Sequence, residues 1–177
     1  MTPNAARAQF YFERTYAATI EEVWALWTTK EGIEAWWGPE GFAVTVTSLD
    51  LRPKGELKYL MTAVTLEVVE YMERSGMALS TPCTVTYTEV VHFDRLTYNT
   101  RTDFVPGVNP YDVATTVDLR QTPDGVLMTI TCDAMHDKSW TDRARAGFES
   151  QLRKLDTLWA GEGQSHASTG VISVAGT

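Results

Sequence analysis

The sequence has few of the residues that form cross-links or bind metals. It contains two cysteines, Cys83 and Cys132, and three histidines among 177 residues. Both cysteines lie in strand-like runs, without the CxxC or Cys/His spacing of a zinc site. We therefore expect reduced, buried thiols and no metal site, in a chain long enough to be stabilised by one hydrophobic core.

Long apolar runs and clusters of basic residues are also missing. No stretch reaches the ~18 apolar residues of a membrane-spanning helix, and the N-terminal MTPNAARAQ has no apolar signal-peptide core. The formal net charge is -8, and the few Lys and Arg residues are scattered. These features disfavour membrane insertion and a nucleic-acid partner, and they predict a soluble protein of the cytoplasm.

The common catalytic motifs are absent. The chain has no G-x-S-x-G, H-E-x-x-H, P-loop or G-x-G-x-x-G sequence, which disfavours hydrolases, metalloproteases and nucleotide-binding proteins. We expect no cofactor. His92 and His136 lie beside acidic residues at the ends of predicted elements, where turn and capping roles account for the acids. No catalytic side chain can be assigned from these residues.

Tryptophan, by contrast, is concentrated, because four of the six lie within residues 20–39. The first half of this segment has the spacing of one helix face at Ile20, Val23, Trp24 and Trp27. Thr19 and Glu22 form the capping-box pattern that begins such a helix. Trp24 and Trp27 are thus predicted to be core anchors.

A second, shorter helix is predicted to carry Trp36 and Trp37 and to end at Gly38-Pro39. Adjacent residues on a helix point about 100° apart, so the two indoles cannot face the same core. One of them should line a groove, a pocket or an interface.

The rest of the chain is mostly strand-like. Hydrophobic residues alternate with polar ones in successive runs, at 42–46, 57–61, 83–91, 96–104, 111–119 and 126–132. Pro53-Lys54-Gly55 and Thr122-Pro123-Asp124-Gly125 are turn signals between runs. Strands joined in this way predict an antiparallel meander with one apolar face.

Two helical segments complete the pattern. Residues 65–76 have helical spacing and interrupt the meander, either as a lid over a cavity or as a cover for a sheet edge. Residues 137–160 carry a long apolar stripe, with Ser139 and Asp142 as the expected capping pair. Gly147 within this helix is expected to allow close packing against a strand or, alternatively, to leave room for a ligand. We predict one domain over residues 9–160, a flexible N-terminus over 1–8, and a Gly/Ser/Thr-rich disordered tail over 161–177.

The chain resembles a known family in four stretches: VWALWTTKEGIEAWWGPEGF, LDLRPKGELKY, PCTVTYTEVVHFDRLTY and GFESQLRKL. They are similar to the START-like SRPBCC superfamily, and within it to homologues of the activator of heat-shock protein 90 ATPase. The resemblance implies an α+β helix-grip fold. Such a fold has a curved antiparallel sheet of six to seven strands around the long C-terminal helix, two short helices after the first strand, and a largely apolar cavity.

The predicted function is binding of a small apolar or aromatic molecule in that cavity. Inward-facing tyrosines would orient the ligand, and methionines would give an adaptable wall. The candidate ligand-binding residues are Trp36, Trp37, Tyr59, Met61, Tyr71, Met72, Tyr87, Tyr98, Tyr111, Met128, Trp140 and Phe148.

Two other functions stay open. The superfamily resemblance suggests a cyclase, hydratase or lyase that uses tyrosine hydroxyls, a reading that Glu89 or His136 close to a tyrosine would favour. The family name suggests a chaperone-interacting stress-response module. A homodimer through an exposed apolar edge is also compatible with the sequence.

Overall fold

The computed structural model describes residues 7–159 and 166–172 of the chain. Strands and helices follow one another in the order β1 (Gln9–Tyr16), α1 (Ile20–Thr28), α2 (Lys30–Trp36), β2 (Phe42–Leu49), β3 (Glu56–Ala63), α3 (Leu66–Arg74), β4 (Ser80–Val91), β5 (Arg95–Thr102), β6 (Tyr111–Thr122), β7 (Gly125–Asp133), α4 (Lys138–Trp159) and β8 (His166–Ile172).

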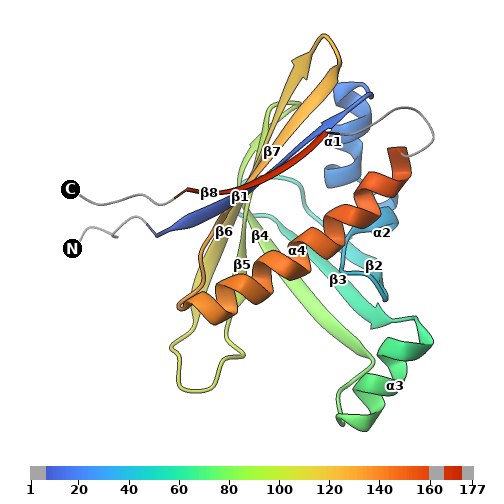
Figure 1. Cartoon of the computed structure of the whole chain (residues 1–177), viewed down its shortest axis with the longest axis vertical. Coiled ribbons are helices and arrows are strands. Elements are labelled where there is room, and N and C mark those ends of the chain that lie inside the picture. Colours follow the sequence, from blue (N-terminus) through green and yellow to red (C-terminus); the bar gives the residue numbers. More distant parts are fainter. Residues whose placement is uncertain (1–6, 160–165, 173–177) are drawn as a thin grey trace.

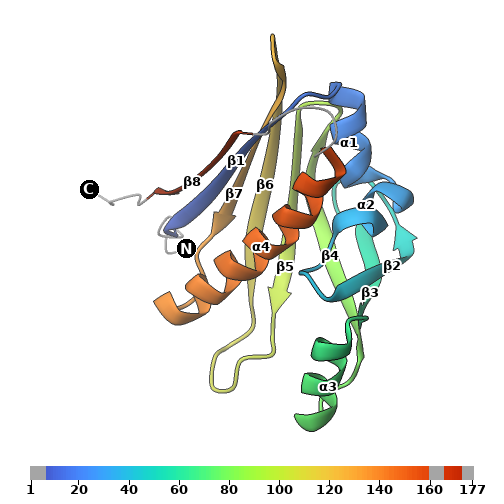
Figure 2. The same cartoon turned by 45° about the vertical axis from the view of Figure 1, so that its right-hand side comes forward.

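The strands form one antiparallel sheet in the order β2-β3-β4-β5-β6-β7-β1-β8. Each strand from β2 to β6 pairs with the next along the chain, and β1 pairs with β7 on one side and β8 on the other. The sheet curves around α4, which runs diagonally across its concave face, while α1 and α2 cover one end (Figures 1 and 2). This architecture confirms the predicted helix-grip fold.

Strict alternation of side chains places the core on the concave face. In β1, Phe10, Phe12, Arg14 and Tyr16 are buried, and each residue between them is only partly covered. The predicted turn at 122–125 joins β6 to β7. There Gly125 has a φ of +130°, and an added Cβ would lie 2.0 Å from the Tyr16 carbonyl oxygen, so glycine is required.

Both short helices begin at threonine caps. The predicted capping box is present, since the Thr19 side chain accepts from the Glu22 N–H and the Glu22 carboxylate accepts from the Thr19 N–H. Thr29 ends α1 and also caps α2 by accepting from the Gly32 N–H at 3.0 Å. The two helices are thus joined by a single residue, which fixes where the tryptophans lie.

The tryptophan cluster divides between core and cavity. Trp24 and Trp27 are 6 % and 1 % exposed, which confirms them as core anchors. Trp36 and Trp37 are also buried, but α2 ends at Trp36 and Trp37 has an extended backbone (φ -63°, ψ 145°). The two rings point in different directions because the backbone changes from helical at Trp36 to extended at Trp37, and not because of the 100° rotation between adjacent helical residues.

Two details of the C-terminal region differ from the predictions. Residues 166–172 of the expected disordered tail form β8, which pairs antiparallel with β1; they add an eighth strand to the predicted six to seven. The rest of the 161–177 tail and residues 1–6 of the N-terminus lie outside the described residues. Asp137, rather than Ser139, caps α4, because its Oδ1 accepts the Trp140 N–H at 2.8 Å.

Gly147 is not a close-packing residue, contrary to the prediction. A Cβ built on it meets no atom within 4 Å, and it lies inside α4. We expect Gly147→Ala to raise the free energy of unfolding by about 0.5–1 kcal/mol, because alanine loses less backbone entropy in a helix. Urea unfolding would measure this; a destabilised variant would contradict it.

Candidate functional site

A cavity of about 250 Å³ lies between the concave face of the sheet and α4. It extends from the buried ring of Tyr98 to the exposed ring of Phe104, so it reaches from the interior to the surface. The residues that line it are Phe10, Trp37, Tyr59, Val85, Tyr98, Thr100, Thr102, Phe104, Val113, Thr115, Cys132, Asp133, Met135, Ala144, Phe148 and Gln151.

Aromatic rings form much of the inner wall. The Trp37 ring centroid lies 5.6 Å from that of Tyr98 and 6.2 Å from that of Tyr59. On the opposite side, Phe148 of α4 stacks on Phe12 of β1 at 5.4 Å, and Phe10 packs edge-on against Phe12 at 5.7 Å. A flat, apolar molecule would find ring faces and edges on both sides.

Neutral polar groups lie among these rings. Burial, and then the neighbouring Cys132 and Tyr59, hold the pKa of Tyr98 well above its usual value, although a hydrogen bond with Thr115 acts against this. Burial also raises the pKa of Tyr59. Burial raises the pKa of the Cys132 thiol to about 12, and the Thr115 hydroxyl donates to its sulfur at 3.8 Å. These groups therefore stay protonated and uncharged at neutral pH.

Lys154 of α4 holds the loop that carries Trp37. Its ammonium group donates to the carbonyl oxygens of Trp37, Gly38 and Phe42 at 3.3, 3.2 and 3.0 Å. Burial lowers the pKa of Lys154, and nearby Glu40 acts in the opposite direction. The lysine thus fixes the Trp-Gly-Pro turn to the helix that forms the other wall of the cavity.

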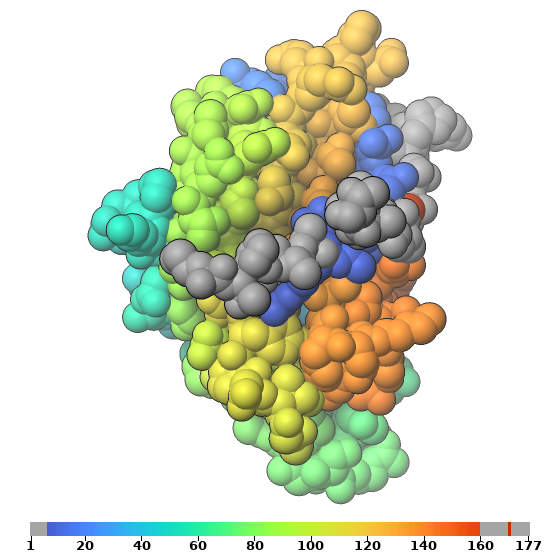
Figure 3. All heavy atoms as spheres, turned by 90° about the vertical axis from the view of Figure 1, so that its left-hand side faces the viewer, coloured from blue at the N-terminus to red at the C-terminus, as the bar shows by residue number. Residues whose placement is uncertain are grey.

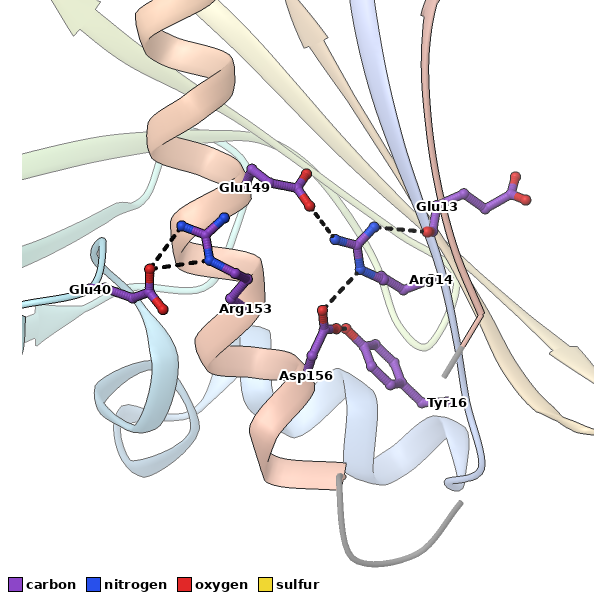
Figure 4. A network of polar contacts seen from close by, with 7 residues as sticks. All are labelled: Glu13, Arg14, Tyr16, Glu40, Glu149, Arg153 and Asp156. Carbon is purple, nitrogen blue, oxygen red and sulfur yellow. Dashed lines mark hydrogen bonds and ion pairs between the residues drawn. The ribbon is translucent and has the colours of Figure 1, made fainter. Parts of the chain in front are cut away.

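A buried charged network joins α4 to β1 (Figure 4). Arg14, whose side chain is 2 % exposed, donates to Glu149 Oε1 at 2.9 Å, to Asp156 Oδ2 at 3.2 Å and to the Glu13 carbonyl. The Tyr16 hydroxyl donates to the other oxygen of Asp156 at 2.7 Å. This network ties α4 to β1, the strand that carries Phe10 and Phe12.

The mouth of the cavity is aromatic. Phe104, in the loop after β5, packs on Trp140 at the start of α4, with ring centroids 5.7 Å apart. In Figure 3, this loop, in yellow, lies beside the first turns of α4, in orange. Trp140 also contacts His136, whose Nδ1 lies 2.7 Å from the Tyr111 hydroxyl. The Tyr111–His136 pair adjoins the cavity through the neighbouring lining residues Val113 and Met135.

The structure brings four of the twelve candidate ligand-binding residues to the cavity wall: Trp37, Tyr59, Tyr98 and Phe148. Tyr111 and Trp140 lie beside its mouth. The remaining six lie elsewhere.

Three of these six belong to the filled core. Trp36 donates its indole N–H to the Leu26 carbonyl, and the Met128 sulfur accepts the indole N–H of Trp27. Tyr87 is buried, and among the described residues its hydroxyl has no hydrogen-bond partner.

The last three lie around the β2–β3 end of the sheet. Met61, on β3, lies next to Gly38, and Met72, on α3, is buried. Tyr71, also on α3, is 61 % exposed. The 65–76 segment is helical as predicted, but none of its residues lines the cavity. It docks instead beside Gly41, whose carbonyl accepts the Val64 N–H.

Several residues that line the cavity are not among the predicted ligand-binding residues, although their spacing indicates that they face inward. Thr100 and Thr102 continue the inward register of Tyr98 along β5. Ala144 and Gln151 lie four residues before and three after Phe148, on the same face of α4. Phe104 has the same register, but it lies in the loop after the end of β5 at Thr102.

The described residues contain no group of three or more His, Cys, Asp or Glu side chains placed to hold a metal ion. Within the same part of the chain, no helix is long and apolar enough to cross a membrane.

Comparison with known proteins gives one family and many structures. A model of the family described as Activator of Hsp90 ATPase homolog 1-like protein matches residues 17–160. A search of curated proteins found no match.

The chain is similar to three bacterial structures, among others. A crystal structure from Chromobacterium violaceum has 23% identity and a TM-score of 0.68, covering 86% of this chain and 97% of that one. A solution structure from Arthrobacter aurescens has 18% identity and a TM-score of 0.67, covering 88% of each chain. An AHSA1-like protein from Aeromonas hydrophila has 20% identity and a TM-score of 0.61, covering 89% and 99%. At these identities the likeness shows the fold.

Proposed function

The chain belongs to the family of Activator of Hsp90 ATPase homolog 1-like proteins, and on that premise we propose that it binds a small apolar or aromatic molecule in the cavity beneath α4. One observation carries the proposal: the cavity is walled by aromatic rings from the sheet, the Trp37 turn and α4, with only a few polar groups among them. Small-molecule sites in proteins have this composition.

The surrounding contacts support a preformed site rather than a packing defect. Lys154 fixes the Trp37 turn and the Arg14 network fixes α4, so the two walls are held apart by polar bonds outside the cavity. Ligand binding to a preformed cavity has a smaller entropic cost than binding to a flexible one, since its walls need no further ordering.

Filling the cavity should abolish binding. Ala144 lines the cavity, and we expect Ala144→Phe to remove the thermal stabilisation that small aromatic compounds give the wild-type protein. Ala146→Phe is the matched control, because Ala146 is exposed on the same helix, and it should respond as the wild type does. Differential scanning fluorimetry with a panel of apolar and aromatic compounds measures both. A wild-type protein that none of the panel stabilises, or an Ala144→Phe variant that responds normally, contradicts the proposal.

The Tyr111–His136 pair supports a second candidate function, an enzyme of the cyclase, hydratase or lyase kind. The Tyr111 hydroxyl lies 2.7 Å from His136 Nδ1, and His136 Nε2 lies 3.5 Å from Asp137 Oδ2. A tyrosine, a histidine and a carboxylate in line can pass a proton to or from a molecule at the cavity mouth.

Mass spectrometry after incubation with compounds that stabilise the protein tests this candidate. Conversion should be lost in Tyr111→Phe while binding remains. Compounds recovered unchanged from the wild type would refute the enzymatic role. The chaperone interaction and the homodimer stay predictions.

A further inference from the structure

The cavity offers no cationic group to a ligand, because no lysine or arginine of the described chain lines it. The one lining carboxylate, that of Asp133, accepts the Gln9 side-chain amide at Oδ1 (2.9 Å) and the Ala114 N–H at Oδ2 (3.3 Å). Three cations lie outside the lining. Arg14 is paired with two carboxylates, Lys154 donates to three carbonyl oxygens, and the Arg145 guanidinium lies over the Phe10 ring, 5.2 Å from its centroid.

An anionic ligand would therefore enter without a counter-ion. The transfer of a carboxylate group from water to such a site costs several kcal/mol when no opposite charge receives it. Contact with the aromatic walls contributes only the apolar part of the binding free energy and does not offset this cost. A negative charge on the ligand should thus lower its affinity for the cavity.

The neutral polar groups gather at the inner end. Tyr98 on β5 pairs with Thr115 on β6, which in turn pairs with Cys132 on β7. Both tyrosines keep their protons, since burial raises their pKa values. A phenol that stays protonated in an apolar cavity is a hydrogen-bond donor, so a ligand oxygen that accepts would be favoured there.

The volume limits the size of the ligand. An apolar cavity of about 150 Å³ accommodates benzene, with its six non-hydrogen atoms. In proportion, about 250 Å³ accommodates roughly ten non-hydrogen atoms, the size of a substituted single ring.

We propose that the cavity selects an uncharged, singly aromatic molecule that carries one accepting oxygen, such as a ketone or an ester, and that the Tyr98 hydroxyl donates to this oxygen. This inference rests on the proposed function, whose ligand class it narrows.

Three probes separate the parts of the inference. 4-Phenyl-2-butanone and 3-phenylpropanoate have the same number of non-hydrogen atoms and differ in charge, and butylbenzene lacks the oxygen. Titration calorimetry on the full chain at neutral pH should rank the ketone first. Butylbenzene should bind up to about tenfold more weakly, the worth of one neutral hydrogen bond, and the carboxylate at least about a hundredfold more weakly.

Two phenylalanine variants test the role of Tyr98. Tyr98→Phe should lower the affinity for the ketone to that for butylbenzene, and the affinity for butylbenzene should stay unchanged. Tyr87→Phe is the matched control, because Tyr87 lies opposite Tyr98 on the next strand, is equally buried and does not line the cavity. It should change neither affinity.

Each failure has a distinct meaning. Equal affinity for ketone and carboxylate would overturn the selection against charge and leave the proposed function standing. A ketone affinity unaltered in Tyr98→Phe would overturn the assignment of the donor. Absence of binding by all three probes would overturn both the inference and the proposed function.

Discussion

Replacement of Arg14 by methionine should lower the free energy of unfolding by about 3 kcal/mol, the lower end of the range for removing one partner from a buried ion pair. Arg14 is almost fully buried, whereas the side chains of Glu149 and Asp156 are 35% and 25% exposed. The two carboxylates can regain some water after the substitution, which limits the loss. The methionine also keeps most of the apolar stem of arginine, so the measured difference reports the charged group.

Arg153→Met is the matched control. Arg153 lies on the same helix and forms an ion pair with Glu40 at 2.8 Å, but both side chains are more than half exposed (Figure 4). Exposed pairs contribute little, so this variant should unfold at nearly the wild-type urea concentration. Equal stability of the two variants would show that the Arg14 network does not hold α4 to the sheet.

The contrast also shows where sequence reasoning stops. Arg14 occupies an inward register position between Phe12 and Tyr16, in a strand whose other inward residues are aromatic. Its acidic partners are 135 and 142 residues further along the chain. The alternation of residues along the strand predicts that Arg14 faces inward. It does not predict the two carboxylates, because they come from α4, which is distant in the sequence.

Local patterns predicted what they directly encode. The Thr19–Glu22 capping box, the turn at residues 122–125 and the helical insert depend on residues a few positions apart, and all three are present. The order of elements and the resemblance in the Trp-Trp-Gly-Pro stretch predicted the helix-grip fold, which the structure confirms.

Predictions failed where a distant segment decides the structure. The Gly/Ser/Thr-rich composition of the tail favoured disorder, but residues 166–172 are paired along the free edge of β1. Ser139 fits the pattern of a helix cap, but Asp137 makes the bond. In the site, register along the strands predicts that Tyr59 and Tyr98 face the inner wall. Phe104 has the same register as Tyr98, but it lies in the loop after β5, and its contact with Trp140 of α4 depends on a helix that is distant in the sequence.

Alkaline solution should unfold this protein steeply above pH 10. Burial raises the pKa of four tyrosines, Tyr16, Tyr59, Tyr87 and Tyr98, and for Tyr16 the neighbouring carboxylate of Asp156 adds to the effect. In the unfolded chain the same hydroxyls ionise near pH 10. The unfolded state therefore loses protons first, and alkali shifts the equilibrium toward it.

The sign follows from linkage. A tyrosine with a raised pKa in the folded state contributes stability that is complete below pH 10 and is lost as the pH rises. Each contributes a slope of about 1.4 kcal/mol per pH unit between its unfolded-state and its folded-state pKa, so four together remove about 5–6 kcal/mol by pH 11 and up to about 11 kcal/mol by pH 12. Domains of this kind are stable by about 5–15 kcal/mol, so all but the most stable of them would unfold by pH 12.

Three other groups alter the onset, one of which is Cys83, whose pKa is raised by burial. Burial raises the pKa of Cys132 to about 12, so its contribution begins to decline near pH 9. Lys154 acts in the opposite direction, because burial lowers its pKa and the folded state is relieved of a charge penalty as the pH approaches 10.5. Since Lys154 has no further effect above that pH, the tyrosines determine the steep part of the curve.

Phenolate absorbance and near-ultraviolet circular dichroism, recorded on the same samples, measure this prediction. The chain has seven tyrosines, so the part of the absorbance change that belongs to the four buried hydroxyls is the part to compare with the dichroism. That part should rise together with the loss of the dichroism, because these hydroxyls ionise only when the core opens. Tyr87→Phe should reduce the slope by about a quarter, since it removes one of the four groups and its hydroxyl has no hydrogen-bond partner among the described residues. If the absorbance of all seven phenolates developed while the dichroism of the folded state persisted, the buried tyrosines would be ionising in the folded protein, and the dry interior inferred for Tyr59 and Tyr98 at the ligand site would be wrong as well.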